Sequence, residues 1–163
     1  VAIKVFKTTL NEFSDRSSYV EGDARYSGLR FNKQSRRQMF GIWAEKEFRN
    51  LRRLEKAQIP APVPLAQRQH VLLLSFLGRG GWPAPQLREM HMSAEGWRGA
   101  YAQSVELTRR MFGARLIHGD FSEYNIIVFH KVCHAIDFGQ SVDLSHPDAR
   151  ELLRRDLAGT RIF

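Results

Sequence analysis

Two aspartates and an asparagine lie at the ends of short apolar runs in the segment LIHGDFSEYNIIVFHKVCHAIDFG, residues 116–139. Asp120 and Asn125 lie five positions apart on a predicted loop between two short strands, and Asp137 directly follows a later apolar run. A carboxylate can accept or orient the proton of a hydroxyl or a water, and amide and carboxylate oxygens are hard ligands for Mg²⁺. This set predicts phosphoryl transfer, because its transition state spreads charge over phosphate oxygens that metal ions neutralise.

The spacing of these residues matches a known catalytic pattern. H-x-D-x-x-x-x-N followed by D-F-G is the signature of protein kinases, and here it consists of His118, Asp120, Asn125 and a D-F-G that begins at Asp137. The chain opens on VAIK, which supplies the strand lysine, Lys4. Each motif alone recurs by chance, but three motifs in this chain order favour a kinase site over ordinary strand ends. We predict a structural role for the histidine, which begins the loop motif.

A kinase lysine pairs with a carboxylate on the following helix, and AEKEFRNL offers Glu45 and Glu47. These positions differ by about 200° around a helix, so only one of them can face the site. Counting back from Leu51 and Leu54 places Glu47 at the edge of the apolar face. We therefore predict Glu47 as the partner of Lys4 and a solvated position for Glu45.

The first half of the chain contains the elements that would position the lysine. Residues 1–7 have a strand pattern, residues 11–38 form a long polar stretch with little periodicity, and residues 39–57 have the apolar spacing of an amphipathic helix. The helix should bury Ile42, Trp43, Phe48, Leu51 and Leu54. IPAPVP then ends it, and HVLLLSFLG predicts a buried strand over residues 70–77.

The second half predicts a mainly helical unit. GRGGWPAP after the strand indicates a flexible connector, so we place a lobe boundary there, with an upper lobe over 1–77 and a lower lobe over 78–163. Ser93 is a suitable N-cap for a helix over 93–113. Its expected core stripe is Trp97, Tyr101, Val105, Thr108 and Phe112. ARLI, NIIVF and VCHAI predict three short strands, and PDARELLRRDLA predicts a last helix.

Composition limits the class of protein further. The 163 residues carry a formal net charge of +8 and a pI of about 10.1, which favours polyanionic partners such as RNA or a nucleotide, although a solvated basic surface explains the charge equally well. Cys133 is the single cysteine, so we expect no internal disulfide, a reducing compartment and a small buried side chain. No run approaches the ~18 apolar residues of a membrane span, so we expect a soluble, intracellular protein. The chain opens in mid-strand pattern, so we expect a fragment.

HGDFSEYN resembles the H-x-D-L-S-E-Y-N of the RIO family of atypical protein kinases, whereas ordinary protein kinases have arginine after the histidine. WAEKEFRNL, IDFGQSV, SHPDA and RRDLAGTRIF are also similar to their counterparts, so the resemblance covers nearly the whole chain. The first and third RIO types match about equally. The resemblance implies an α/β (α+β), bilobal protein-kinase-like fold of RIO type, truncated at the N-terminus before its Gly-rich loop.

The resemblance also implies a role for each matching residue. It implies that Lys4 contacts the ATP phosphates, that Glu47 orients the lysine, and that Asp120 is the catalytic aspartate. Asn125 and Asp137 would then bind Mg²⁺ or Mn²⁺, and Ser122 and Glu123 would lie near the phosphates. Ser75 and Leu77 would offer backbone groups to adenine. It implies a serine/threonine kinase or ATPase in cytoplasmic maturation of the small ribosomal subunit, with the pre-40S particle or its rRNA as partner and Asp137 as a candidate phosphoacceptor. Basic residues that could meet rRNA phosphates are at 16, 25, 30, 33, 36, 37, 46, 49, 52, 53 and 56.

Two other functions stay open on the sequence. Small-molecule phosphotransferases of the aminoglycoside or choline kinase type also carry an H-G-D and a later I-D-F, although the S-E-Y-N and the long polar segment argue against them. The other alternative is an RNA-binding or ribosome-binding module in which the kinase site acts as a nucleotide-dependent switch. Intact Lys4, Asp120, Asn125 and Asp137 argue against a dead site, but they do not separate a switch from a kinase.

Overall fold

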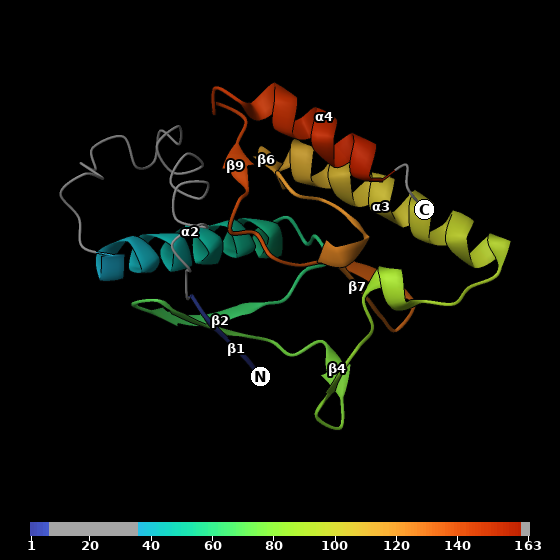
Figure 1. Ribbon diagram of the computed structural model, residues 1–163, viewed down its shortest axis with the longest axis horizontal. Helices are drawn as coiled ribbons and strands as arrows, with labels where there is room; N and C mark the ends of the chain where they lie inside the picture. The colour runs from blue at the N-terminus through green and yellow to red at the C-terminus, as the bar shows by residue number, and fades with distance from the viewer. Residues whose placement is uncertain (7–35, 161–163) are drawn as a thin grey trace.

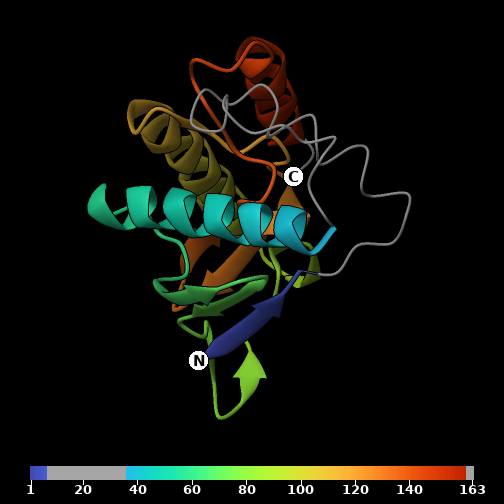
Figure 2. The same cartoon turned by 90° about the vertical axis from the view of Figure 1, so that its left-hand side faces the viewer.

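Helix α2 (Arg36–Lys56) crosses the middle of the computed structural model, which describes residues 1–6 and 36–160 (Figure 1). On one side of it lies an antiparallel sheet of three strands, β1 (Ala2–Val5), β2 (Pro64–Arg68) and β3 (Val71–Leu74), in the order β1-β3-β2. The other side holds α3 (Ala94–Gly113) and α4 (Ala149–Gly159). Figure 2 shows the same arrangement in a second view, with the sheet and the two helices on opposite sides of α2.

The predicted amphipathic helix is confirmed, with small differences. Trp43, Leu51 and Leu54 are buried, and Ile42 and Phe48 are half-buried against the same core. The helix begins at residue 36, so the last three residues of the polar stretch 11–38 are helical and not loop. Residues 11–35 of that stretch lie outside the described residues. β1 confirms the predicted first strand, and its register with β3 places Lys4 opposite Leu72.

Two parts of the upper lobe differ from the prediction. β2 was not expected, because PLAQR is polar and begins at a proline; its pairing with β3, which shifts register between Pro64 and Ala66, defines it. The segment expected to be a flexible connector contains a short hairpin of β4 (Gly78–Arg79) and β5 (Trp82–Pro83). Gly80 and Gly81 turn it with positive φ, a conformation that glycine adopts without steric cost.

Helix α3 begins as predicted, because the Ser93 Oγ accepts a hydrogen bond from the Gly96 backbone N–H. The predicted core stripe is wrong. Tyr101, Val105 and Phe112 are exposed, Trp97 is half-buried, and only Thr108 of that set is buried. The buried residues of this helix are Ala100, Ser104, Leu107, Thr108 and Met111. The small side chains of Ala100 and Ser104 let the helix lie close to the strands that it covers. The size of the side chains therefore indicates the buried face of this helix better than their apolar character does.

The rest of the second half of the chain consists of short paired strands joined by loops. β6 (Leu116–Ile117) pairs with β9 (Val142–Asp143), and β7 (Ile126–Phe129) pairs with β8 (Val132–Ala135), which confirms the three predicted strands. Single 3-10 turns, η3 (Leu87–Glu89) and η4 (Glu123–Asn125), precede α3 and β7. The loops 118–125 and 136–141 therefore emerge beside each other. Among the helices in the described part of the chain, none is both long and apolar enough to cross a membrane.

Candidate active site

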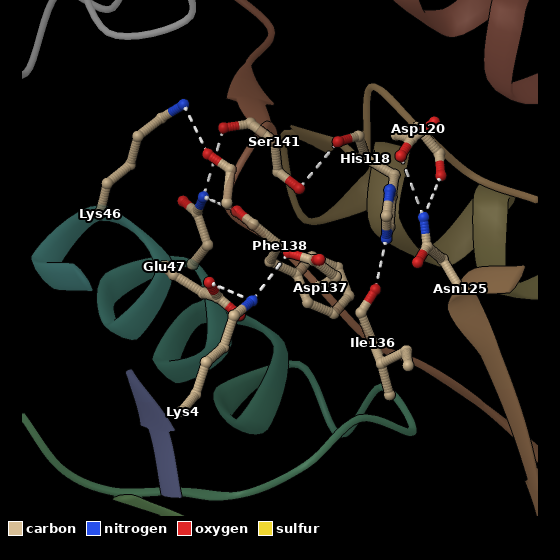
Figure 3. Close-up of polar contacts among 12 residues, drawn as sticks. Lys4, Lys46, Glu47, His118, Asp120, Asn125, Ile136, Asp137, Phe138 and Ser141 are labelled. Atoms are coloured by element: carbon tan, nitrogen blue, oxygen red, sulfur yellow. Dashed lines mark hydrogen bonds and ion pairs between the residues drawn. The ribbon is translucent and has the colours of Figure 1, made fainter. Parts of the chain in front are cut away.

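Lys4, Glu47 and Asp137 meet at the boundary between α2 and the sheet (Figure 3). The Lys4 Nζ donates to both carboxylate oxygens of Glu47, at 2.9 and 2.8 Å, and to Asp137 Oδ1 at 2.8 Å. Glu45 pairs instead with Arg49 one turn along the surface of α2. The geometric prediction for the two glutamates is therefore confirmed: Glu47 faces the lysine, and Glu45 is on the solvated face.

Burial and charge act in opposite directions on this ion pair. Burial alone would lower the pKa of Lys4, but the two carboxylates outweigh it and raise the pKa above the ordinary lysine value of 10.5. Burial raises the pKa of Glu47, and the nearby Asp137 charge adds to this, while Lys4 opposes it. The lysine is therefore held charged at neutral pH, close to where an anionic ligand could approach.

Asp137 has an unusual backbone. Its φ is +62°, in the left-handed region, which costs a residue with a side chain about 1–2 kcal/mol. The following Phe138 is fully buried and its carbonyl accepts from the Asn50 Nδ2 at 3.2 Å, so the segment is fixed just after the strained residue. The Asp137 side chain itself remains 49% exposed. The carboxylate is thus rigidly placed but open to a ligand.

Asp120 and Asn125 are in direct contact on the neighbouring loop. The Asn125 Nδ2 donates to the Asp120 backbone oxygen at 2.8 Å and to its Oδ2 at 3.1 Å. The backbone oxygen of Asn125 accepts from the Ile136 N–H at 2.9 Å, which brings this loop next to Asp137. The amide oxygen of Asn125 points away from Asp120 (Figure 3). It is therefore available as a ligand.

The donor set suits Mg²⁺ held only partly by protein. Asn125 and Asp137 offer hard oxygen atoms, and Mg²⁺ is commonly bound through one or two such side chains plus phosphates and water. No group of three His, Cys, Asp or Glu side chains able to hold a metal occurs within residues 1–6 and 36–160. The residues present fit a metal that arrives with a nucleotide.

His118 and Asp156 hold the loop 118–125 from inside. His118 is fully buried, and its Nε2 donates to the Ile136 backbone oxygen at 2.9 Å, which agrees with the predicted structural role. Asp156 on α4 accepts from the Gly119 and Phe121 backbone N–H groups, both at 3.0 Å. Burial raises its pKa, against the backbone donors and the nearby histidine. Sequence reasoning missed Asp156, which stands in an otherwise ordinary helical segment, RRDLAG.

The other predicted nucleotide contacts lie close to these loops or at the junction of the lobes. Ser122 and Glu123 are half-buried at the start of η4, and the Ser122 carbonyl accepts from the Asn125 N–H. The Ser75 N–H donates to the Val63 carbonyl and the Leu77 carbonyl accepts from the Ala84 N–H. The Ser75 carbonyl and the Leu77 N–H have no partner among the described residues, so one acceptor and one donor remain for adenine. Those contacts stay predictions.

Lys46 and Cys133 are both buried, which the sequence predicted for the cysteine but not for the lysine. Lys46 was counted among the basic residues that could meet rRNA, but it is fully buried and its Nζ donates to the Gly139 carbonyl at 3.3 Å, so that interpretation is wrong for this residue. The basic positions from 16 to 33 lie outside the described residues. Cys133 is buried in β8, as expected, and burial raises the pKa of its thiol to about 11.

Comparison with known proteins identifies the family. A family model described as the RIO domain matches residues 1–163. The chain is 38% identical over 163 residues to the RIO-type serine/threonine-protein kinase Rio1 of Thermoplasma acidophilum, with 100% of this chain and 83% of that protein aligned. It is 43% identical to both human RIO1 and mouse RIO3, with 99% of this chain aligned but only 28% and 31% of those proteins. The chain therefore spans less than a third of the latter two relatives, and the two RIO types match it equally well.

Solved structures place the fold. A Rio2 kinase from Chaetomium thermophilum, in a complex with ADP, Mg²⁺ and phosphoaspartate, superimposes with a TM-score of 0.67 and 28% identity, covering 81% of this chain and 41% of that one. A second structure of that kinase gives a TM-score of 0.70 at 23% identity, with 97% and 47% covered. The expected α/β, kinase-like fold is confirmed.

Proposed function

The chain belongs to the RIO family, and from this we propose that it binds ATP with Mg²⁺ and transfers the γ-phosphoryl group as an atypical serine/threonine protein kinase or an ATPase. The observation that carries the proposal is the pairing of Lys4 with Glu47 and Asp137 across 43 and 133 residues of sequence. A lysine held charged by two carboxylates, beside a second loop with Asp120 and Asn125, is the arrangement that phosphoryl transfer requires.

Each residue has a distinct proposed task. Lys4 would donate to the phosphate oxygens of ATP, with Glu47 fixing its direction. Asn125 and Asp137 would hold Mg²⁺, which neutralises charge on the phosphates when bound. Asp120 is exposed and would accept the proton of the attacking hydroxyl or water, while the bond from the γ-phosphorus to the β,γ-bridging oxygen breaks and ADP leaves.

The acceptor of the phosphoryl group is the second part of the proposal. The related Rio2 structure is described as a phosphoaspartate complex, and Asp137 here is half-exposed at the site, which supports this carboxylate as an acceptor. Transfer would form an acyl phosphate on Asp137 and release ADP; attack by water would then release inorganic phosphate. The net reaction would be ATP hydrolysis, which is why we include an ATPase beside a protein kinase.

We also propose that the protein acts in the cytoplasm on the precursor of the small ribosomal subunit, with the pre-40S particle or its rRNA as partner. The net charge of +8 supports a polyanionic partner. A hollow of about 420 Å³ on α2 is lined by Phe48, Arg49, Arg52, Arg53 and Lys56, and its three arginines also pair with Glu45, Glu55 and Asp143. Lys56 lies nine residues after Glu47, or about 180° around the helix, so this basic face is on the opposite side of α2 from the nucleotide.

The test is ATP hydrolysis and autophosphorylation by the full-length protein with Mg²⁺, compared with Asp120→Ala and with pre-ribosomal particles present or absent. We expect turnover that requires Asp120 and responds to the particles. Turnover that is the same in wild type and Asp120→Ala would refute the enzyme assignment. ATP binding without turnover under every condition would favour the nucleotide-gated binding module, and phosphorylation of an aminoglycoside or choline would favour the small-molecule phosphotransferase.

A further inference from the structure

The side-chain amide of Asn50 joins α2 to the segment that carries Asp137. Asn50 is fully buried, and its Nδ2 lies 3.2 Å from the Phe138 carbonyl and 3.3 Å from the Ser141 carbonyl. The two N–H groups of one amide can serve both acceptors at once. These bonds connect residues that are 88 and 91 positions apart in the sequence. One side chain thus fixes the segment at two points.

The first contact point directly follows the strained residue of the site. The Phe138 carbonyl accepts from Asn50 and the Phe138 side chain is fully buried, so α2 and the core together hold this residue in place. Asp137, just before it, has the left-handed backbone that an L-residue adopts only when the surroundings enforce it. With the Phe138 backbone fixed, the Asp137 carboxylate is aimed at Lys4.

The second contact point leads to the catalytic loop. Ser141 accepts from Asn50 through its carbonyl and donates from its Oγ to the His118 carbonyl at 2.9 Å. His118 in turn donates to the Ile136 carbonyl, on the segment before Asp137. The chain of bonds runs from Asn50 through Ser141 to His118, and Figure 3 shows its last step, from Ser141 to His118. It cross-links the loops 118–125 and 136–141 to each other and to α2.

We infer that Asn50 is a positioning residue. Through Phe138 it makes the placement of Asp137 depend on the position of α2, and through Ser141 it does the same for the loop that bears Asp120. The inference rests on the proposed function, since it assigns Asn50 to the metal-dependent half of the nucleotide site. The residue acts through Asp137 and touches no substrate itself.

The test compares Asn50→Leu, which removes both donors at similar volume, with the milder Asn50→Ser, which keeps one donor. Ser104→Ala is the matched control, because Ser104 is equally buried and its hydroxyl donates to the Ala100 carbonyl within its own helix, α3. Calorimetry on the full-length proteins measures ATP affinity with Mg²⁺ and with EDTA. Hydrogen exchange measures protection of the peptides 136–141 and 118–121, and thermal unfolding verifies that each variant is folded.

We expect Asn50→Leu to weaken ATP binding in Mg²⁺ by about 10- to 100-fold, the usual effect of removing a residue that orients a metal ligand. Binding in EDTA, which depends on Lys4, should change by less than about threefold, and Asn50→Ser should lie between Asn50→Leu and wild type. Exchange should rise in both peptides. Ser104→Ala should resemble wild type in both binding experiments.

The inference is wrong if the ATP affinity of the variants falls equally with Mg²⁺ and with EDTA, because an equal fall indicates a general loss of structure. It is also wrong if Asn50→Ser and Asn50→Leu are folded and bind ATP as tightly as wild type. Failure of the proposed function has a different signature: wild type itself binds no ATP. In that case the exchange experiment still decides the matter, because unchanged protection of 136–141 and 118–121 in the Asn50 variants would refute a positioning role.

Discussion

Replacing Asp156 with asparagine tests whether α4 holds the catalytic loop. Its two carboxylate oxygens accept from the Gly119 and Phe121 backbone N–H groups at 3.0 Å. Asparagine keeps one acceptor oxygen and turns a donor toward the other N–H. The change loses one hydrogen bond to a charged group, worth about 1.5–3 kcal/mol, and leaves a buried N–H unsatisfied, worth about 1–3 kcal/mol.

Removing a buried charge offsets part of this loss, because burial raises the pKa of Asp156 and so disfavours its ionised form. We expect a net destabilisation of about 2–4 kcal/mol, which corresponds to a fall in Tm of about 5–15 °C for a domain of this size. Turnover should also fall, because Gly119 and Phe121 flank Asp120. It would be measured well below the unfolding temperatures of both wild type and Asp156→Asn.

The matched control for this experiment is Glu151→Gln on the same helix. The Glu151 side chain is 67% exposed, and its partner among the described residues is Arg154, so its loss should change stability by less than about 0.5 kcal/mol. Thermal unfolding by circular dichroism and ATP hydrolysis would be measured on all three proteins. A Tm for Asp156→Asn within about 2 °C of the control, with unchanged turnover, would refute the reasoning.

Three further predictions follow from the same geometry. Glu47→Gln should lower the free energy of unfolding by about 1–3 kcal/mol and weaken ATP binding, because it removes a charged hydrogen-bond acceptor of Lys4. Glu45→Gln on the solvated face should change neither, as denaturant titration and calorimetry can establish. Gly159→Ala should lower both Tm and turnover, because a Cβ there would collide with the Phe121 carbonyl; an unchanged Tm would contradict the close packing. Burial alone would raise the pKa of Asp143, but hydrogen bonds from Arg53 and Ser145 outweigh it and hold the pKa below the ordinary value of 3.8. Asp143 therefore contributes stability that is fully present above pH 3.8 and is lost progressively as the pH falls below it. Unfolding temperatures of Asp143→Asn and wild type should therefore converge between about pH 4 and pH 2, and a constant difference would exclude this linkage.

The grouping of the candidate site residues was predictable because their identities and spacing are local. His118, Asp120 and Asn125 lie within eight residues, and the helical phase of Leu51 and Leu54 was enough to choose Glu47 over Glu45. The predictions that were wrong concern features that depend on contacts between residues distant in sequence. β2 is a strand only because β3 pairs with it, and the face of α3 that is buried was determined by how closely the helix approaches its strands.

Asn50 and Asp156, two polar residues that hold the site, were missed, although the helices carry a signal for them. Trp43, Glu47, Asn50 and Leu54 follow one face of α2, and all four are buried. Asp156 occupies the same kind of position in α4, on a face with Ala149 and Leu152. A polar residue at an apolar position of a helix therefore predicts a partner outside the helix.

The type of side chain decides whether that prediction holds. Ser104 and Thr108 also lie on the buried face of their helix, but their hydroxyls donate to the carbonyls four residues earlier, Ala100 and Ser104, and so need no distant partner. The carboxylate of Asp156 has no hydrogen to donate, and the helix interior offers it no free N–H. It must therefore find donors elsewhere, and the loop that carries Asp120 supplies them. A carboxylate or amide on a buried helical face, rather than a hydroxyl, is thus the sequence feature that would have located the residues supporting this site.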